Sequence, residues 1–124
     1  MASTELNYRI TADSLNVGQE TTYCPITGIL NSAVVHYPPG CNSLVEVFIR
    51  RGSNQIFPYP SQTGGASFTN YGVTLDATTQ SFELNVSVNR GDPIEVKILN
   101  HDGQYEHTIS VILLLSEQKS YTGP

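Results

Sequence analysis

Histidine and aspartate side chains near the C-terminal part of the chain are the first candidates for chemistry. His101, Asp102 and His107 stand close together in the sequence, and two imidazoles with a carboxylate can ligate a metal ion. The pattern places His101 and Asp102 on a turn and His107 in the strand that follows, so we expect the two histidines to approach each other across a hairpin. No third His stands at tight spacing with these residues. The sequence therefore favours a hydrogen-bonded structural role and predicts no metal.

Nucleophiles and acid–base pairs offer little support for an enzyme. The sequence has no G-x-S-x-G elbow. Glu46, Glu83 and Glu95 fall on the polar faces of predicted strands, where a carboxylate is ordinarily solvated. Carboxylates that pair only in space, as in glycoside hydrolases, cannot be read from sequence. We therefore predict a non-enzymatic protein with no catalytic residues and no cofactor.

The two cysteines, Cys24 and Cys41, flank a predicted strand at residues 27–37. Extended residues advance about 3.3 Å each, so a straight strand separates its ends by about 35 Å. A disulfide needs Cα atoms within about 7 Å of each other. We expect two free, buried thiols, which fits folding in a reducing cytoplasm.

One turn spells the tripeptide that integrin ligands display, Arg90-Gly91-Asp92. The surrounding Asn-Arg-Gly-Asp-Pro is also ordinary turn chemistry, with Gly available for a positive φ. We interpret it as a turn, and an adhesion role is the alternative.

A long loop at residues 58–72 carries no charge and is rich in Pro, Gly and aromatic residues. Long loops in compact domains are usually functional or disordered, and aromatic residues argue against disorder. These side chains could stack on sugar rings, fold back over the domain or contact a neighbouring subunit. The candidates for loop contact or glycan binding are Phe57, Tyr59, Phe68 and Tyr71.

Strands must position all of these residues, and the best-patterned segment is 81–115. Apolar residues alternate with polar ones at 82–88 and 94–98, and an apolar run at 105–115 follows two turns. This predicts a three-strand antiparallel meander. Further strands are expected at 6–12, 19–24, 27–37, 43–51, 55–57 and 73–75.

About eight strands, with 73–75 as a short optional addition, and no helix or repeat predict an all-β, eight-strand antiparallel sandwich of the jelly-roll type. An immunoglobulin-like sandwich is the alternative, but the chain has no Trp. Within the strands, we expect Leu30 on the face opposite Ala33 and Val35. We expect Phe48 on an outer face with charged residues.

The closing strand is apolar on both faces, so it is either covered by a loop or contacts another subunit. We predict subunit contact. The predicted interface residues are Tyr105, Ile109, Val111, Ile112, Leu113 and Leu114.

Composition limits the class of protein. The 124 residues suit one domain, 1–124, with flexible N-terminal residues and a polar tail from about 116. A formal net charge of −5 and six dispersed basic residues argue against nucleic-acid binding. No apolar run is long enough for a membrane span, and we expect no secretory signal.

Several segments resemble small all-β proteins of viruses and phages. They are His-Tyr-Pro-Pro-Gly-Cys at 36–41, Leu-Val-Glu-Val at 44–47, Gln-Ile-Phe-Pro at 55–58 and Asn-His-Asp-Gly-Gln-Tyr-Glu-His-Thr at 100–108. Such proteins are similar to single jelly rolls that serve as minor capsid, decoration or turret components. The resemblance implies a structural role at the virion surface, assembly in the host cytoplasm, and contacts with copies of itself or a capsid protein. It assigns no functional residues.

Overall fold

The computed structural model describes residues 3–52, 54–57 and 74–117, and the backbone alone at 61–63 and 67–69. The described residues contain strands and no helix, so none of them forms a helix that could cross a membrane. The strands are β1 (Ser3–Ala12), β2 (Val17–Tyr23), β3 (Gly28–Tyr37), β4 (Val45–Arg51), β5 (Asn54–Phe57), β6 (Ser61–Thr63), β7 (Ser67–Thr69), β8 (Thr78–Val88), β9 (Pro93–Asn100) and β10 (His107–Glu117).

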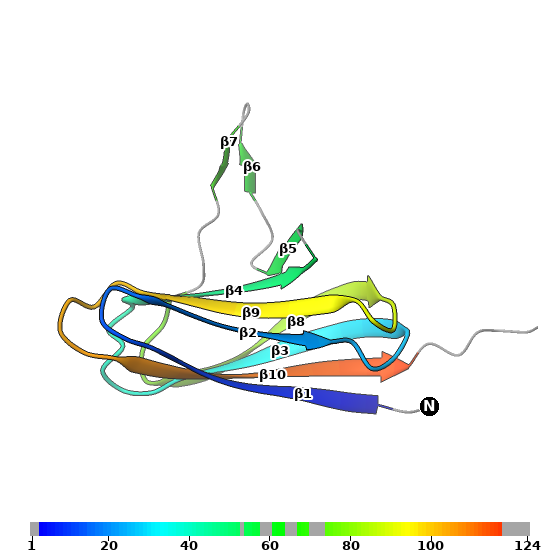
Figure 1. The fold of residues 1–124 in the computed structure, drawn as a ribbon, viewed down its shortest axis with the longest axis horizontal. Helices are drawn as coiled ribbons and strands as arrows, with labels where there is room; N and C mark the ends of the chain where they lie inside the picture. The colour runs from blue at the N-terminus through cyan, green and yellow to red at the C-terminus, as the bar shows by residue number, and fades with distance from the viewer. Residues whose placement is uncertain (1–2, 53, 58–60, 64–66, 70–73, 118–124) are drawn as a thin grey trace, which may run out of the picture.

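Two four-stranded antiparallel sheets form the body of the molecule (Figure 1). One has the order β1-β10-β3-β8 and the other has the order β2-β9-β4-β5. The pairs β1–β10, β2–β9, β3–β8 and β4–β5 are those of one long hairpin whose tip is β4–β5. Rolling that hairpin so that successive pairs alternate between two sheets produces a jelly roll. The predicted all-β, eight-strand sandwich of jelly-roll type is confirmed.

The predicted meander at 81–115 is wrong. Strands β8, β9 and β10 follow one another in the chain, but β8 and β10 lie in one sheet and β9 lies in the other. Alternation of apolar and polar residues shows which side of a strand is buried, and it does not show which strand is the neighbour.

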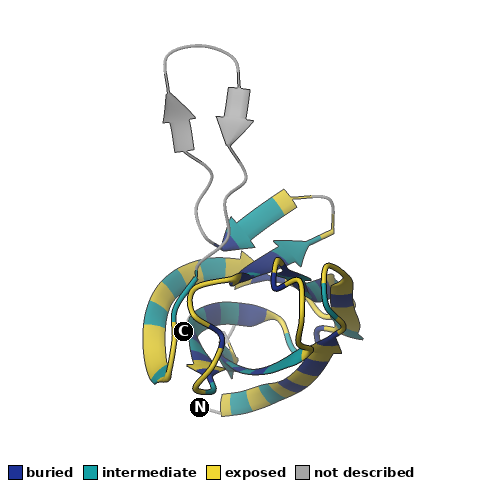
Figure 2. Ribbon diagram, turned by 90° about the vertical axis from the view of Figure 1, so that its left-hand side faces the viewer, coloured by how far each residue is buried: buried dark blue, intermediate teal, exposed yellow. Residues whose placement is uncertain are grey.

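The core lies between the inner faces of the two sheets, and buried and exposed residues alternate along most strands (Figure 2). Leu30 belongs to this core together with Ala33 and Val35, which corrects its predicted face. The reason is a bulge between Leu30 and Ser32, where the pairing of β3 with β10 and with β8 shifts register. One extra residue in a strand reverses the side on which all later residues lie.

Phe48 is the other residue whose environment differs from the prediction. It lies opposite Lys97 in the pairing of β4 with β9, on the outer face as expected. Its side chain is nevertheless buried, and it lies outside the main core cluster.

Several predicted boundaries also change. The segment expected as one long loop contains β6 and β7, which pair as a separate two-stranded sheet. No strand forms at Thr74 and Leu75, while Val73 is outside the described residues. Strand β2 begins at Val17, two residues before the strand predicted at 19–24. Strand β10 continues to Glu117, so the tail predicted from about 116 begins as strand, and its remainder lies outside the described residues. Residues 1–2 of the N-terminal segment predicted to be flexible also lie outside the described residues.

Connections gather at two opposite ends of the sandwich. At one end, which we call the pocket end, the amide of Leu15 donates to the carbonyl of Asp102 at 3.1 Å and that of His101 donates to Leu44 at 2.8 Å. These bonds bring together the loops at 13–16, 38–44 and 101–106, the last of which is the orange loop at the left of Figure 1. At the other end, the amide of Cys24 donates to the carbonyl of Asp92, and the amide of Gly91 donates to the carbonyl of Cys24. These two hydrogen bonds join the 24–27 loop to the 89–92 turn.

Candidate functional site

An open pocket of about 560 Å³ lies at the pocket end, between the 38–44 loop and the segment 102–107. The loop that follows β3 forms one wall and the loop that precedes β10 forms the other. Its lining residues are Pro39, Gly40, Asn42, Leu44, Asp102, Gln104, Tyr105, Glu106 and His107.

A row of polar contacts links the two walls. Nε2 of His107 lies 2.8 Å from Oδ2 of Asp102, and its Nδ1 lies 3.9 Å from Sγ of Cys41. The tautomer with the proton on Nε2 satisfies both contacts, because it donates to the carboxylate and accepts from the thiol. Cys41 is fully buried, and His107 and Asp102 expose little of their side chains. The row therefore connects the loops from beneath and is largely shielded from water.

Cys41, His107 and Asp102 follow one another in the order of nucleophile, base and carboxylate that thiol enzymes use. The pKa of the thiol, however, is shifted in the opposite direction from that of a catalytic cysteine. Burial, followed by the charges of Asp76 and Asp102, raises the pKa of the Cys41 thiol. A reactive cysteine needs a lowered pKa and access to solvent. Cys41 has neither, so the geometry supports a structural role for this row.

Asp102 also shapes the 101–106 loop. Its Oδ1 accepts hydrogen bonds from the amides of Gln104 at 2.8 Å and Tyr105 at 3.3 Å. The hydrogen bond from His107 and then that from Gln104 lower the pKa of the Asp102 carboxyl. The side chain of the buried Asn100 donates a hydrogen bond to the Tyr105 carbonyl at 2.9 Å and accepts one from the Asp102 amide at 2.9 Å. The backbone that carries Tyr105 is thus held on both sides.

The opposite wall is held by Asp76. Its Oδ1 accepts from the amides of Gly40 at 3.0 Å and Asn42 at 2.9 Å. Gly40, Asn42 and Ser43 all have positive φ. Such a run turns successive amides toward one anion, and here the Asp76 carboxylate serves as that anion.

The predicted relation between the histidines is not what the structure shows. His101 turns to Glu46, with which it forms an ion pair when protonated, while His107 turns to Asp102 and Cys41. No group of three metal-ligating side chains occurs among residues whose side chains are described. Sequence reasoning grouped His107 with His101 and Asp102, of which Asp102 is its hydrogen-bond partner, and it missed Cys41. The only feature of the sequence that could have pointed to the contact between Cys41 and His107 is that each of them adjoins a strong turn sequence.

Both cysteines are free and buried, as predicted. Cys24 lies at the other end of the sandwich, where its thiol donates to the carbonyl of Ile26 at 3.1 Å.

The aromatic loop candidates separate into two groups. Phe57 is buried and packs against Phe82 with ring centroids 4.8 Å apart, so it does not offer a stacking surface. This corrects its predicted role. Tyr59 and Tyr71 lie outside the described residues, and only the backbone of Phe68 is described.

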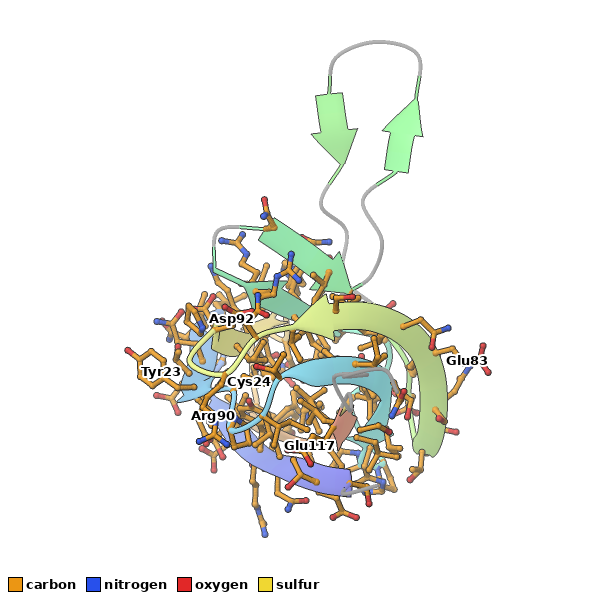
Figure 3. All side chains as sticks on the ribbon, turned by 90° about the vertical axis from the view of Figure 1, so that its right-hand side faces the viewer. Tyr23, Cys24, Glu83, Arg90, Asp92 and Glu117 are labelled. Carbon is orange, nitrogen blue, oxygen red and sulfur yellow. The ribbon has the colours of Figure 1, made fainter. Side chains whose placement is uncertain are left out.

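Arg90, Gly91 and Asp92 form a tight turn at the end that faces the viewer in Figure 3. Oδ2 of Asp92 accepts from the Asn89 amide at 2.8 Å, and the Arg90 amide donates to the Thr27 hydroxyl at 3.0 Å. Because the turn itself uses the Asp92 carboxylate, these contacts favour the turn interpretation.

The predicted interface residues are divided between the two faces of β10 and the pocket. Ile109, Val111 and Leu113 are fully buried in the core of their own chain, so the prediction must be corrected for these three. Ile112 and Leu114 lie on the outer face and are partly exposed. Tyr105 is 65% exposed and lines the pocket.

Comparisons with known proteins support the fold alone. No protein-family model matches the chain, and no curated protein matches it. Among solved structures, a mitogen from Yersinia pseudotuberculosis is similar with a TM-score of 0.53 and 14% identity, over 98% of this chain and 93% of that one. FlhE is similar with a TM-score of 0.40 and 13% identity, over 91% and 98% of the chains.

A third similar structure is an exo-β-1,3-galactanase from Phanerochaete chrysosporium, with a TM-score of 0.45 and 9% identity. The match covers 92% of this chain and 29% of that one. The likeness to the Yersinia mitogen, at 14% identity, indicates a shared β-sandwich and does not indicate a shared activity.

Proposed function

We propose that this protein is a non-enzymatic structural subunit of a virion surface, and that it associates with copies of itself through the outer face of the β1-β10-β3-β8 sheet. The segments that resemble viral jelly rolls support the setting. Two free, buried thiols support folding and assembly in a reducing cytoplasm. The observation that carries self-association is an apolar patch at the centre of that face.

The patch consists of Val34, Ile112 and Leu114. Ile112 lies directly opposite Val34 in the pairing of β10 with β3, and Leu114 is two residues further along β10 on the same side. All three are partly exposed, although β10 lies between two neighbouring strands. An apolar centre on a solvent-facing sheet is stabilised when a second surface covers it.

The rim of the patch is polar and suits a second copy. Arg9 and Glu5 flank Asn7 on β1, and Asn7 lies opposite Ile112. A two-fold axis that runs across the strands through Asn7, Ile112 and Val34 stacks each β1 on its partner. That axis places Arg9 of one copy over Glu5 of the other, so the face is complementary to itself in charge as well as apolar contact.

The size of the face sets the expected strength of association. Ten-residue strands in a four-stranded sheet present roughly 600 Å². Two such faces bury about 1,200 Å², which is the low end for a specific protein interface. We therefore expect a weak dimer in solution that becomes stable where many copies are held together, as on a particle.

The test is the mass in solution by light scattering across a concentration series. Wild type is expected to change from monomer to dimer, and Ile112→Lys is expected to remain a monomer because a charge in the patch stays unpaired. Val17→Lys is the matched control, since Val17 is an exposed apolar residue on β2 of the other sheet. A wild-type monomer at every concentration, or an unchanged Ile112→Lys, refutes the proposal.

A charge exchange tests the geometry of the interface. Arg9→Glu alone is expected to weaken the dimer, and Arg9→Glu combined with Glu5→Arg is expected to restore it. If the double variant is no better than the single one, the proposed two-fold axis is wrong.

A further inference from the structure

We propose that the pocket at the pocket end binds an uncharged sugar ring of a glycan, with Tyr105 as the surface on which the ring stacks. This site lies outside the sheet face assigned above to self-association, and it differs from the aromatic segment 57–71 on which the sequence placed glycan binding.

Two large apolar side chains are exposed at this site. Among the described residues, the large exposed apolar side chains are Leu15, Val17, Tyr23, Leu44 and Tyr105. Leu44 and Tyr105 both line the pocket. An exposed aromatic ring and an aliphatic side chain in one pocket offer apolar surface with a polar hydroxyl at the edge of the ring, which matches the apolar C–H face and the hydroxyl rim of a pyranose.

The remaining lining groups match sugar hydroxyls. Asn42, Gln104 and Glu106 are exposed on the pocket walls. An amide both donates and accepts hydrogen bonds and a carboxylate accepts several, so together they serve hydroxyls in either role. A pocket with an apolar surface and a few converging polar groups is typical of small-ligand sites, and its volume lies in their usual range of about 300–1,000 Å³.

Charge decides the class of sugar. Among the described residues, no Lys or Arg lines the pocket, whereas Asp102 and Glu106 do. A sulfated, phosphorylated or sialylated glycan would bring a negative charge next to these carboxylates at an energetic cost. The geometry therefore points to neutral glycans.

The walls are already held in place, which lowers the entropic cost of binding. Asp76 holds the backbone at Gly40 and Asn42. Asp102 and Asn100 hold the backbone at Tyr105. The polar row beneath the pocket fixes one wall relative to the other.

The experiment uses the full chain on a printed array of neutral, sialylated and sulfated glycans. The best neutral oligosaccharide is then titrated in solution by calorimetry. Binding by neutral glycans is expected, and Tyr105→Ala is expected to weaken it by at least about tenfold through loss of the stacking face. Tyr23→Ala is the matched control, because Tyr23 is 69% exposed on β2 near the other end of the molecule.

Three results overturn the proposal: no neutral glycan binds, binding is confined to acidic glycans, or Tyr105→Ala binds as well as Tyr23→Ala. Thermal melting of both variants verifies that they are folded. Light scattering on Tyr105→Ala separates this site from self-association, which should be unchanged in that variant.

Discussion

Asp102 is the residue on which the pocket end depends most. It accepts hydrogen bonds from the His107 ring and from two backbone amides, and its own carbonyl receives the amide of Leu15. One residue thus connects β10 and the 101–106 loop through its carboxylate, and the 13–16 turn through its main-chain carbonyl. Its ionised form is stabilised by these donors, so the stability of this end should depend on pH.

Asp102→Asn should expose that dependence. The hydrogen bonds to Asp102 lower its folded-state pKa below the unfolded value of about 4. The stabilisation is therefore present above the unfolded pKa and is lost as the pH falls through the folded pKa. We expect the variant to have a lower free energy of unfolding than wild type at pH 7, and a smaller difference at about pH 2.

Urea unfolding at both pH values measures this difference. Asp13→Asn removes an exposed carboxylate at the same end and serves as the control. An equal loss for Asp102→Asn at both pH values would show that its charge is not the stabilising feature.

At the scale of elements, the close approach of β1 and β2 depends on Gly18. A Cβ built on Gly18 would lie 2.7 Å from Cγ2 of Ile10 and 2.8 Å from the carbonyl oxygen of Thr11. The second contact is with backbone, which cannot turn aside. Gly18 lies just before the strand predicted at 19–24, and the structure shows that it is a strand residue whose missing side chain makes room for β1.

Gly18→Ala is therefore expected to lower the free energy of unfolding by about 1–3 kcal/mol through overpacking. Gly103→Ala is the control, because nothing lies within 4 Å of a Cβ at that position. We expect the control to stay within about 0.5 kcal/mol of wild type. Chemical denaturation of the three proteins compares them, and a Gly18→Ala protein as stable as wild type would contradict the contact.

At the scale of the molecule, rolling the hairpin places β10 between β1 and β3, where it has one face in the core and one in solvent. The same rolling brings the loops before β4 and before β10 together at the pocket end. It leaves the apolar patch on a sheet face and the pocket at an end. The two proposed contacts are therefore spatially separate on one subunit.

Adjacent leucines on β10 should respond in opposite ways to truncation. Leu113 is fully buried, so Leu113→Ala is expected to cost about 2–5 kcal/mol of folding free energy. Leu114 lies on the outer face, so Leu114→Ala is expected to reduce self-association and to lower folding free energy much less. Denaturation and light scattering on both variants measure the two effects, and similar destabilisation by both would contradict the assignment of faces.

Local patterns in the sequence determined the strand class, most strand positions and the inner faces of strands such as β1 and β8. Alternation sufficed there because a half-buried strand must keep its apolar residues on one side. Turn chemistry likewise identified the 89–92 turn, and the length of the strand between the two cysteines indicated that they are separate.

Only the tertiary structure decided the rest, because those features depend on residues that are distant in the chain. The bulge at Leu30 reverses a face through its pairing with both β8 and β10. The partners of β9 belong to another sheet from those of β8 and β10. The contact of Cys41 with His107 spans 66 positions, and no local pattern of residues specifies a contact that forms only when two loops are brought together by the roll of the sheets.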